Sequence, residues 1–490
     1  MKIRTLFFLL SILIIPIVSA TGNVTFNEHY TGNTLRIDFF HTWEKTYEAV
    51  KLDAVYKEGP WAGNPDSLLD PFGYGRYKIK LFTKDTSQLI YSKGYDSYFG
   101  EYKTTNDAAA GKRKTFHETA LLPFPKKPVT FVLELMNKKG GTEKLISLDL
   151  DPSSPDIKEA EKKDDKTILP VHNTGDPSKK VDLVIIAEGY RAEDENKLKR
   201  DLEKVKKTFF SQQPYKKEKD KFNINCVFKP SKDSGPDEPR QKIFRDTAIS
   251  ATFNSLGSSR YLLTEDNRSL RNIASMVPYD AIIIMVNSKR YGGGGIYNSF
   301  CTFTSDNRQT SYLLLHEFGH SFSGLADEYY SSSVAYNDFY PKGSEPVEAN
   351  ITALLDPENL KWKDYVTEGI KIPTPWGKTE YDEKSKKFRK KRAALNKKIE
   401  KMSKNNFPKF AIKKVKAELD ELIEKNRKDT KSFFSDNKLK DSVGAFEGAG
   451  YSSEGLYRPM LDCIMFSIGQ KPYCRVCEKA VSDMINYYTR

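Results

Sequence analysis

The pattern of hydrophobic and polar positions changes near residue 180. Before that point apolar and polar residues alternate in short runs, for example at 35–39 and 77–81. Alternation with a period of two is typical of strands that bury one face and expose the other. Several such runs separated by glycine-rich turns favour two packed sheets. We therefore predict an N-terminal β-sandwich that acts as an accessory domain over residues 21–150.

The next segment, residues 151–180, breaks this pattern. It contains PSSPDIKEAEKKDDK, which is charged, rich in proline and poor in apolar residues. Such composition is typical of the exposed connections between domains. We interpret residues 151–180 as a linker.

Beyond the linker the apolar runs become continuous. The run VDLVIIA opens at Val181 and has the composition of a strand buried on both faces. Helical spacing follows at Leu198, Leu202, Val205 and Phe209. Further strands are predicted at 222–228, 280–287 and 296–304, and then a helix with Thr310 or Ser311 as its N-cap. The fold class is therefore α+β, with an α/β domain over residues 181–490.

One charged segment interrupts this second domain. The chain carries a formal net charge of +13, and residues 378–431 contain 20 Lys or Arg and 9 Asp or Glu. The basic charge therefore belongs to one Lys-rich helical insertion, and no nucleic-acid-reading motif accompanies it. Two interpretations stay open for the insertion: a solvated helical hairpin broken near Pro408, or a docking arm for an acidic partner.

The N-terminus predicts export. Lys2 and Arg4 precede an apolar run of about 13 residues, which is too short to span a bilayer, and a small-residue site follows at Ala20. This is the order of a cleavable signal peptide, residues 1–20. We expect a secreted, periplasmic or cell-surface protein without a stable membrane span.

Five cysteines do not form a disulfide scaffold in a chain of 490 residues. Cys474 and Cys477 form a single CxxC, which without a second pair is a weak indication of zinc. Cys463 lies nearby, and export permits disulfides. A local disulfide from Cys463 to Cys474 or Cys477 is the preferred interpretation.

The motif with the clearest chemistry is His316-Glu317-Phe318-Gly319-His320, an HExxH sequence. Residues at i and i+4 share one face of a helix, so both imidazoles can reach one metal ion. Glu317 lies beside that ion without being needed as a ligand, which suits a general base that deprotonates water. The sequence thus predicts zinc bound by His316 and His320.

A zinc ion that keeps one position open for water needs a third protein ligand. Gly324 can end the helix and turn the chain back, which makes Asp327 the preferred candidate and Glu328 the alternative. The logic is that of HExxHxxGxxH, although the glycine and the ligand each come one residue later and Asp replaces His. Alternatively, Asp327 does not bind the metal and instead orients one of the histidine ligands through a hydrogen bond.

Two further positions are candidates for the same site. Met465 could form a methionine-containing turn beneath the metal, as in metzincins. Tyr457 could donate a hydrogen bond to the oxyanion, a role for which Tyr329 and Tyr330 compete. The position of Met465 just before the last helix favours the turn, and core packing is the alternative for each of these side chains.

The chain resembles the M64 peptidases, the IgA peptidase family. The segments that carry the resemblance are HEFGHSFSGLADEY, VDLVIIAEGY, FNINCVFKPSKDSG, GLYRPMLDCIMFSIG and YCRVC, and the first 150 residues resemble the N-terminal β-domain of that family. The resemblance implies a secreted zinc metallopeptidase with a metzincin-like catalytic domain. It implies zinc binding by His316 and His320, a Glu317 base, Met465 in the turn and Asp327 as third ligand. It does not imply IgA as the substrate.

The predicted function is a secreted zinc endopeptidase that hydrolyses protein or peptide substrates, host glycoproteins included. The alternative is a surface module that binds a glycan or a protein and has an inert or structural zinc site. A zinc hydrolase acting on a non-peptide amide is a third interpretation. Glu317 favours the enzymes, because an inert site has no need of a base.

Overall fold

The computed structural model describes residues 24–137, 141–160, 165–330 and 340–489. The predicted signal peptide, residues 1–20, lies outside the described residues. Among those described, no helix combines the length and the apolar character needed to cross a membrane.

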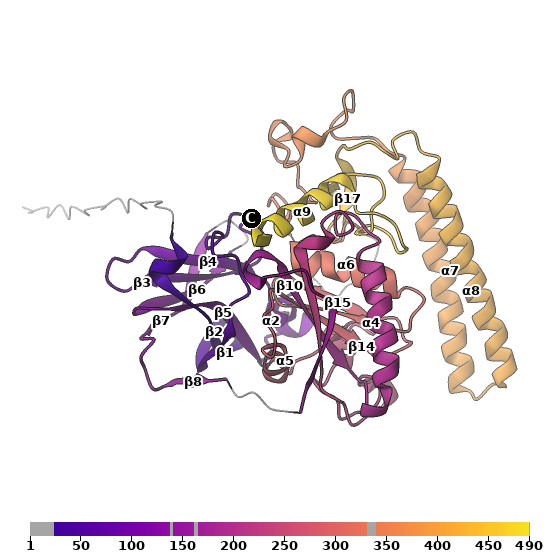
Figure 1. The fold of residues 1–490 in the computed structure, drawn as a ribbon. Coiled ribbons are helices and arrows are strands. Elements are labelled where there is room, and N and C mark those ends of the chain that lie inside the picture. Colours follow the sequence, from indigo (N-terminus) through magenta and orange to yellow (C-terminus); the bar gives the residue numbers. More distant parts are fainter. Residues whose placement is uncertain (1–23, 138–140, 161–164, 331–339, 490) are drawn as a thin grey trace, which may run out of the picture.

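The N-terminal region is β-rich (Figure 1). One four-stranded sheet has the order β5-β1-β2-β8 and a second has the order β4-β3-β6-β7. Leu35, Ile37 and Phe39 of the first sheet share a core with Ile79 and Leu81 of the second, as the alternating pattern predicted. The strands are β1 (Tyr30–Glu44), β2 (Tyr47–Pro60), β3 (Tyr77–Thr83), β4 (Leu89–Tyr95), β5 (Lys114–Pro125), β6 (Val129–Met136), β7 (Thr142–Leu150) and β8 (Ile157–Glu159).

A six-stranded sheet follows, with the order β15-β16-β14-β10-β11-β9. Its central strands are parallel, and the two edge strands, β9 and β15, are antiparallel to their neighbours. Every residue of β10 is buried, which explains its continuous apolar run. The strands are β9 (Thr167–His172), β10 (Val181–Glu188), β11 (Phe222–Phe228), β14 (Ala281–Val286), β15 (Gly293–Ile296) and β16 (Phe300–Thr304).

Helices cover both faces of this sheet (Figure 1). Leu183 and Ile185 of β10 join a core with α4 (Glu195–Phe209), α6 (Thr310–Ser323) and α9 (Arg475–Thr489). Val184 and Ile186 face the other way, into the core of α5 (Asn267–Ala274) and the N-terminal sheets. The molecule is therefore a mixed α/β protein whose N-terminal β-rich region packs on one face of the central sheet.

The charged segment forms two helices, α7 (Lys378–Lys404) and α8 (Lys409–Ser435), that run side by side as an arm (Figure 1). Only Val415 and Phe434 of the two helices are buried. Phe434 packs at the base of the arm against Trp376 and Phe466. The remaining elements are α1 (Phe26–His29), α2 (Tyr98–Lys103), α3 (Asn106–Ala109), β12 (Thr252–Phe253), β13 (Leu262–Leu263), β17 (Phe446–Ala449) and β18 (Ser452–Arg458).

Three local expectations differ from the structure. The segment expected as a linker, 151–180, contributes β8 and β9 to two different sheets. The strand expected at 296–304 is two strands, because the chain turns between Ile296 and Phe300. The N-cap of α6 is Gln309, and the Thr310 hydroxyl instead donates to the carbonyl oxygens of Thr304 and Asn307, at 2.8 Å and 2.7 Å.

Candidate active site

The HExxH motif lies on α6, which packs between the six-stranded sheet and the C-terminal segment. Leu313, Leu315 and Phe318 of this helix are fully buried. Strand β15 lies directly against the helix, and a Cβ placed on Gly295 would overlap the Glu317 carbonyl oxygen. The glycine run is thus explained by close packing: only glycine lets the strand backbone approach the helix this closely.

The helix ends where the sequence requires a turn. Gly324 has a φ of 60° and its N–H donates to the His320 carbonyl oxygen at 3.0 Å. This left-handed C-cap favours glycine because it has no Cβ. The turn brings Asp327 back over the last turn of the helix.

Three potential ligand atoms converge there. Nε2 of His316 and Nε2 of His320 lie 3.2 Å apart, and Asp327 Oδ1 lies 3.2 Å from each. Ligands about 2.0–2.1 Å from a tetrahedral zinc ion are separated by about 3.3 Å. The residues present therefore fit a zinc ion held by two imidazoles and one carboxylate, with a fourth position left for water.

Hydrogen bonds to neighbouring groups hold the two imidazoles in the tautomer that metal binding requires. Nδ1 of His316 donates to the Ile464 carbonyl oxygen at 3.0 Å, and Nδ1 of His320 donates to the Leu325 carbonyl oxygen at 2.5 Å. With the proton on Nδ1, each Nε2 keeps its lone pair free for a metal. The Tyr451 hydroxyl donates to Oδ2 of Asp327, which leaves Oδ1 directed at the imidazoles.

Glu317 lines the same cavity as the three ligands. Burial raises the pKa of its carboxyl group above the usual value, and His316 and His320 partly offset that rise. A carboxylate with a raised pKa is a better proton acceptor, which suits a general base. The other lining residues include Arg260, Tyr291, Tyr312, Tyr329 and Tyr451.

Two known protein families match the chain. The family described as IgA Peptidase M64 matches residues 169–485, and the family described as Peptidase M64 N-terminus matches residues 25–147. The chain belongs to the M64 peptidase family. No curated protein matches it. The two family segments correspond to the β-rich region and to the region built around the six-stranded sheet.

In this M64 peptidase, Met465 lies under the histidine helix. A Cβ on Gly319 would come 3.2 Å from the Met465 sulfur, so the thioether packs against the helix between the two ligands. The Met465 carbonyl oxygen also accepts a hydrogen bond from Glu328 N at 2.9 Å. The 463–466 segment thus contacts both the ligand helix and the turn that carries Asp327.

Tyr457 and Glu328 lie elsewhere. Tyr457 pairs through its backbone with Thr352, and it is not among the described residues that line the cavity. Glu328 points away from the histidines into a group of cysteines. Tyr451, whose hydroxyl donates a hydrogen bond to Asp327, was missed by sequence reasoning. It lies outside every recognisable motif, and its place depends on a positive φ of 64° after Gly450.

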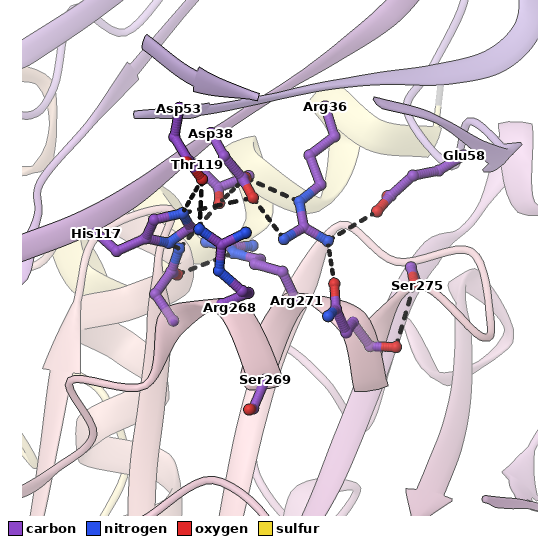
Figure 2. Close-up of polar contacts among 12 residues, drawn as sticks. Arg36, Asp38, Asp53, Glu58, His117, Thr119, Arg268, Ser269, Arg271 and Ser275 are labelled. Atoms are coloured by element: carbon purple, nitrogen blue, oxygen red, sulfur yellow. Dashed lines mark hydrogen bonds and ion pairs between the residues drawn. The ribbon is translucent and has the colours of Figure 1, made fainter. Parts of the chain in front are cut away.

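A second group of carboxylates and histidine lies between the β-rich region and α5. Asp38, Asp53 and His117 have oxygen and nitrogen atoms close enough together for a metal. Figure 2 shows instead that arginines occupy the group. Arg36 makes two hydrogen bonds to Asp38, at 2.8 Å and 2.7 Å, and Arg268 Nη2 lies 2.5 Å from Asp53 Oδ2. These guanidinium groups already neutralise the carboxylates, so we assign this group to the contact between the two regions.

Proposed function

We propose that this M64 family member is a secreted zinc-dependent endopeptidase with Glu317 as its general base. The observation that carries the proposal is the convergence of two Nε2 atoms and one carboxylate oxygen on a single point beside Glu317. Family membership supports a peptidase, and therefore a protein or peptide substrate. The predicted signal peptide supports export.

His316, His320 and Asp327 would hold the zinc ion. When bound, the ion supplies a Lewis acid that polarises the scissile carbonyl and makes water more acidic. Glu317 takes the proton from the attacking water and delivers it to the leaving amine. Its raised pKa helps the second step, because a carboxyl group must hold the proton long enough to donate it.

The edge strand offers a place for the substrate backbone. β15 lies at the edge of the six-stranded sheet, directly beside α6, and Gly293, Gly294 and Gly295 line the cavity. An extended peptide could add to this edge by backbone hydrogen bonds. The parallel bridge from Tyr261 to Gly293 already uses the first residue of the edge, so Gly294 and Gly295 are the positions left for a substrate.

The arrangement also supports a metzincin-like catalytic domain. A helix with two histidines, a glycine turn, a third ligand beyond it and a methionine beneath the helix occur here in that order. In this chain the third ligand is a carboxylate rather than an imidazole. Tyr457 as oxyanion donor stays a prediction.

The proposal is tested with Glu317→Gln and a matched control, Glu358→Gln, whose side chain is exposed. We expect Glu317→Gln to keep the zinc and to cleave casein about 10²–10⁴-fold more slowly, because it cannot accept a proton. Glu358→Gln should match the wild type. Metal content is measured by mass spectrometry beside the cleavage assay.

Unchanged cleavage by Glu317→Gln would contradict the proposal. Zinc without cleavage in the wild type would favour the binding module.

A further inference from the structure

Four potential metal ligands meet in the core behind the active site. They are Glu328, Cys463, Cys474 and Cys477, and each is at most 4% exposed. One ligand atom from each lies within 4.8 Å of all the others. Glu328 follows Asp327 directly, Cys463 lies two residues before Met465, and the CxxC pair lies at the start of α9. None of the four lines the cavity of the active site.

The distances match a tetrahedral zinc site. The sulfur atoms of Cys463 and Cys477 are 3.8 Å apart, and Cys474 Sγ lies 3.8 Å from Glu328 Oε1. Thiolates about 2.3 Å from zinc are separated by about 3.8 Å in a tetrahedron. A disulfide would require about 2.05 Å between the sulfurs. Cys477 Sγ also lies 3.1 Å from Glu328 Oε1, which brings the carboxylate into the group.

The polar surroundings favour deprotonated ligands. Cys474 N donates to the Cys463 sulfur at 3.1 Å, and Cys477 N donates to the Cys474 sulfur at 3.4 Å. Both N–H groups lie at the start of α9, whose positive dipole end stabilises thiolates. These are the contacts expected around a metal-bound CxxC pair rather than around inert thiols.

Of the four potential ligands, Glu328 is the one whose burial is hardest to explain without a bound metal ion. It is fully buried, and its Oε2 has no hydrogen-bond partner among the described residues. Its Oε1 accepts from Asn350 Nδ2 at 3.1 Å and, when no metal is bound, from the Cys477 thiol at 3.1 Å. A buried carboxylate is costly unless it is paired or coordinates a metal. Arg458, also fully buried, attracts Glu328 electrostatically but donates its hydrogen bonds to backbone carbonyl groups.

We propose that Glu328, Cys463, Cys474 and Cys477 bind a second, structural zinc ion. Four protein ligands leave no position for water, which is the composition of a closed structural site. The ion would fasten together the segment after Asp327, the segment before Met465 and the start of α9. The catalytic ligand and the methionine turn would then be held in place from behind. This inference does not depend on the proposed peptidase activity.

The first experiment counts metal ions in the full-length mature chain purified without chelator. We expect two zinc ions per chain in the wild type and one in the double variant His316→Ala, His320→Ala. The double variant Cys474→Ser, Cys477→Ser should lose the second ion. The matched control is Cys226→Ala, which removes a buried thiol of β11 outside the group and should keep both ions.

A second experiment needs no cysteine variant, in case that variant does not fold. Thiols are titrated in denaturant with a chelator and without reductant, and we expect all five cysteines to react. A Cys463 disulfide would leave three. In the His316→Ala, His320→Ala protein, substitution by Co²⁺ should give the charge-transfer absorption of cobalt bound to thiolates.

The outcomes separate this inference from the proposed function. A zinc ion that survives the loss of both histidines supports the cysteine site, whatever the protein cleaves. A single zinc ion that disappears with the histidines overturns the cysteine site and leaves the peptidase proposal intact. Three titratable thiols, or no thiolate absorption with cobalt, would also overturn it.

Discussion

Two buried groups of this protein contain aspartate and histidine, yet they differ in what faces the carboxylates. In the contact between the β-rich region and α5, Asp38 accepts hydrogen bonds from Arg36 and from the Thr119 hydroxyl, the latter at 2.6 Å. Its side chain is fully buried and its charge is met by a guanidinium ion (Figure 2). The cation that balances the charge of Asp38 is therefore a side chain of the protein itself.

Around Asp327 the partners are imidazoles and a phenol. Oδ1 faces Nε2 of His316 and of His320, and Oδ2 accepts from Tyr451. Each imidazole donates its Nδ1–H to a backbone carbonyl group, so in the neutral ring its Nε2 is an acceptor that can bind a metal. Acceptors that converge without a donor between them call for a cation. The comparison teaches that residue types alone do not identify a metal site; the charge that faces them does.

Removing Asp327 should have the largest effect. If Asp327 is the third zinc ligand, as proposed, Asp327→Ala should lose the histidine-site zinc ion and reduce cleavage by more than the ~10–100-fold that an outer partner costs. Metal analysis and a casein assay measure both. Asp53→Ala serves as the control and should keep metal and activity, since the Asp53 carboxylate contacts His117 and Arg268, away from the histidine site. Full zinc content in Asp327→Ala would place the third ligand elsewhere.

The free energy of unfolding should respond in the opposite order, with a greater loss for Asp38→Ala than for Asp327→Ala. Asp38→Ala removes two hydrogen bonds of buried Arg36 and leaves Glu58 as its remaining carboxylate partner, so we expect a cost of up to about 3–5 kcal/mol in the free energy of unfolding. Asp327→Ala, measured with a chelator present, should cost less, because its hydrogen-bond and ion-pair partners are imidazoles and a phenol rather than a buried guanidinium ion. Urea unfolding of both variants in chelator decides the matter. A greater loss for Asp327→Ala would remove the distinction between the two groups.

Tyr451→Phe tests the support of the metal ligand. Loss of the hydroxyl frees Oδ2 of Asp327, and we expect metal affinity to fall by about 10–100-fold. Competition with a zinc chelator measures the affinity. Tyr457→Phe is the matched variant and should leave the affinity unchanged. If it instead slows cleavage with the metal retained, the sequence-based role of Tyr457 as oxyanion donor gains support.

The smallest effect concerns pH. Burial lowers the pKa of His117 below its usual value, and Arg268 lowers it further, while Asp38 and Asp53 act in the opposite direction. On acidification through about pH 6.5 the unfolded chain therefore takes up a proton before the folded chain does, so stability falls. His117→Gln should weaken this loss in unfolding measured at about pH 8 and about pH 5.5. An unchanged pH dependence would contradict the assignment.

The sequence predicted those parts of the fold whose signal is local. The strands at 222–228 and near 281–286, the buried β10 and the face of α4 follow directly from runs and spacing. The turn after α6 was equally local, because Gly324 follows the motif closely. At the start of α6 the pattern misplaced the N-cap, because the Thr310 hydroxyl donates to the preceding carbonyl oxygens of Thr304 and Asn307.

The parts that escaped prediction depend on distant pairing. Tyr451 reaches Asp327 across 124 residues, and Cys477 reaches Glu328 across 149. No spacing rule connects residues so far apart, so the sequence favoured a disulfide from Cys463 to the CxxC pair and gave only a weak indication of zinc. Glycines 293–295 were equally ambiguous in sequence, because a turn and a close-packed strand both favour glycine.

The hydrogen bond from His316 to the Ile464 carbonyl oxygen joins positions 148 residues apart. During synthesis the histidine helix is therefore complete long before the backbone that orients its imidazoles exists. A nascent or truncated chain that ends before Ile464 carries the whole HExxH motif but lacks the acceptor that fixes the proton on Nδ1. The orientation of the His316 ring is thus fixed only late in folding.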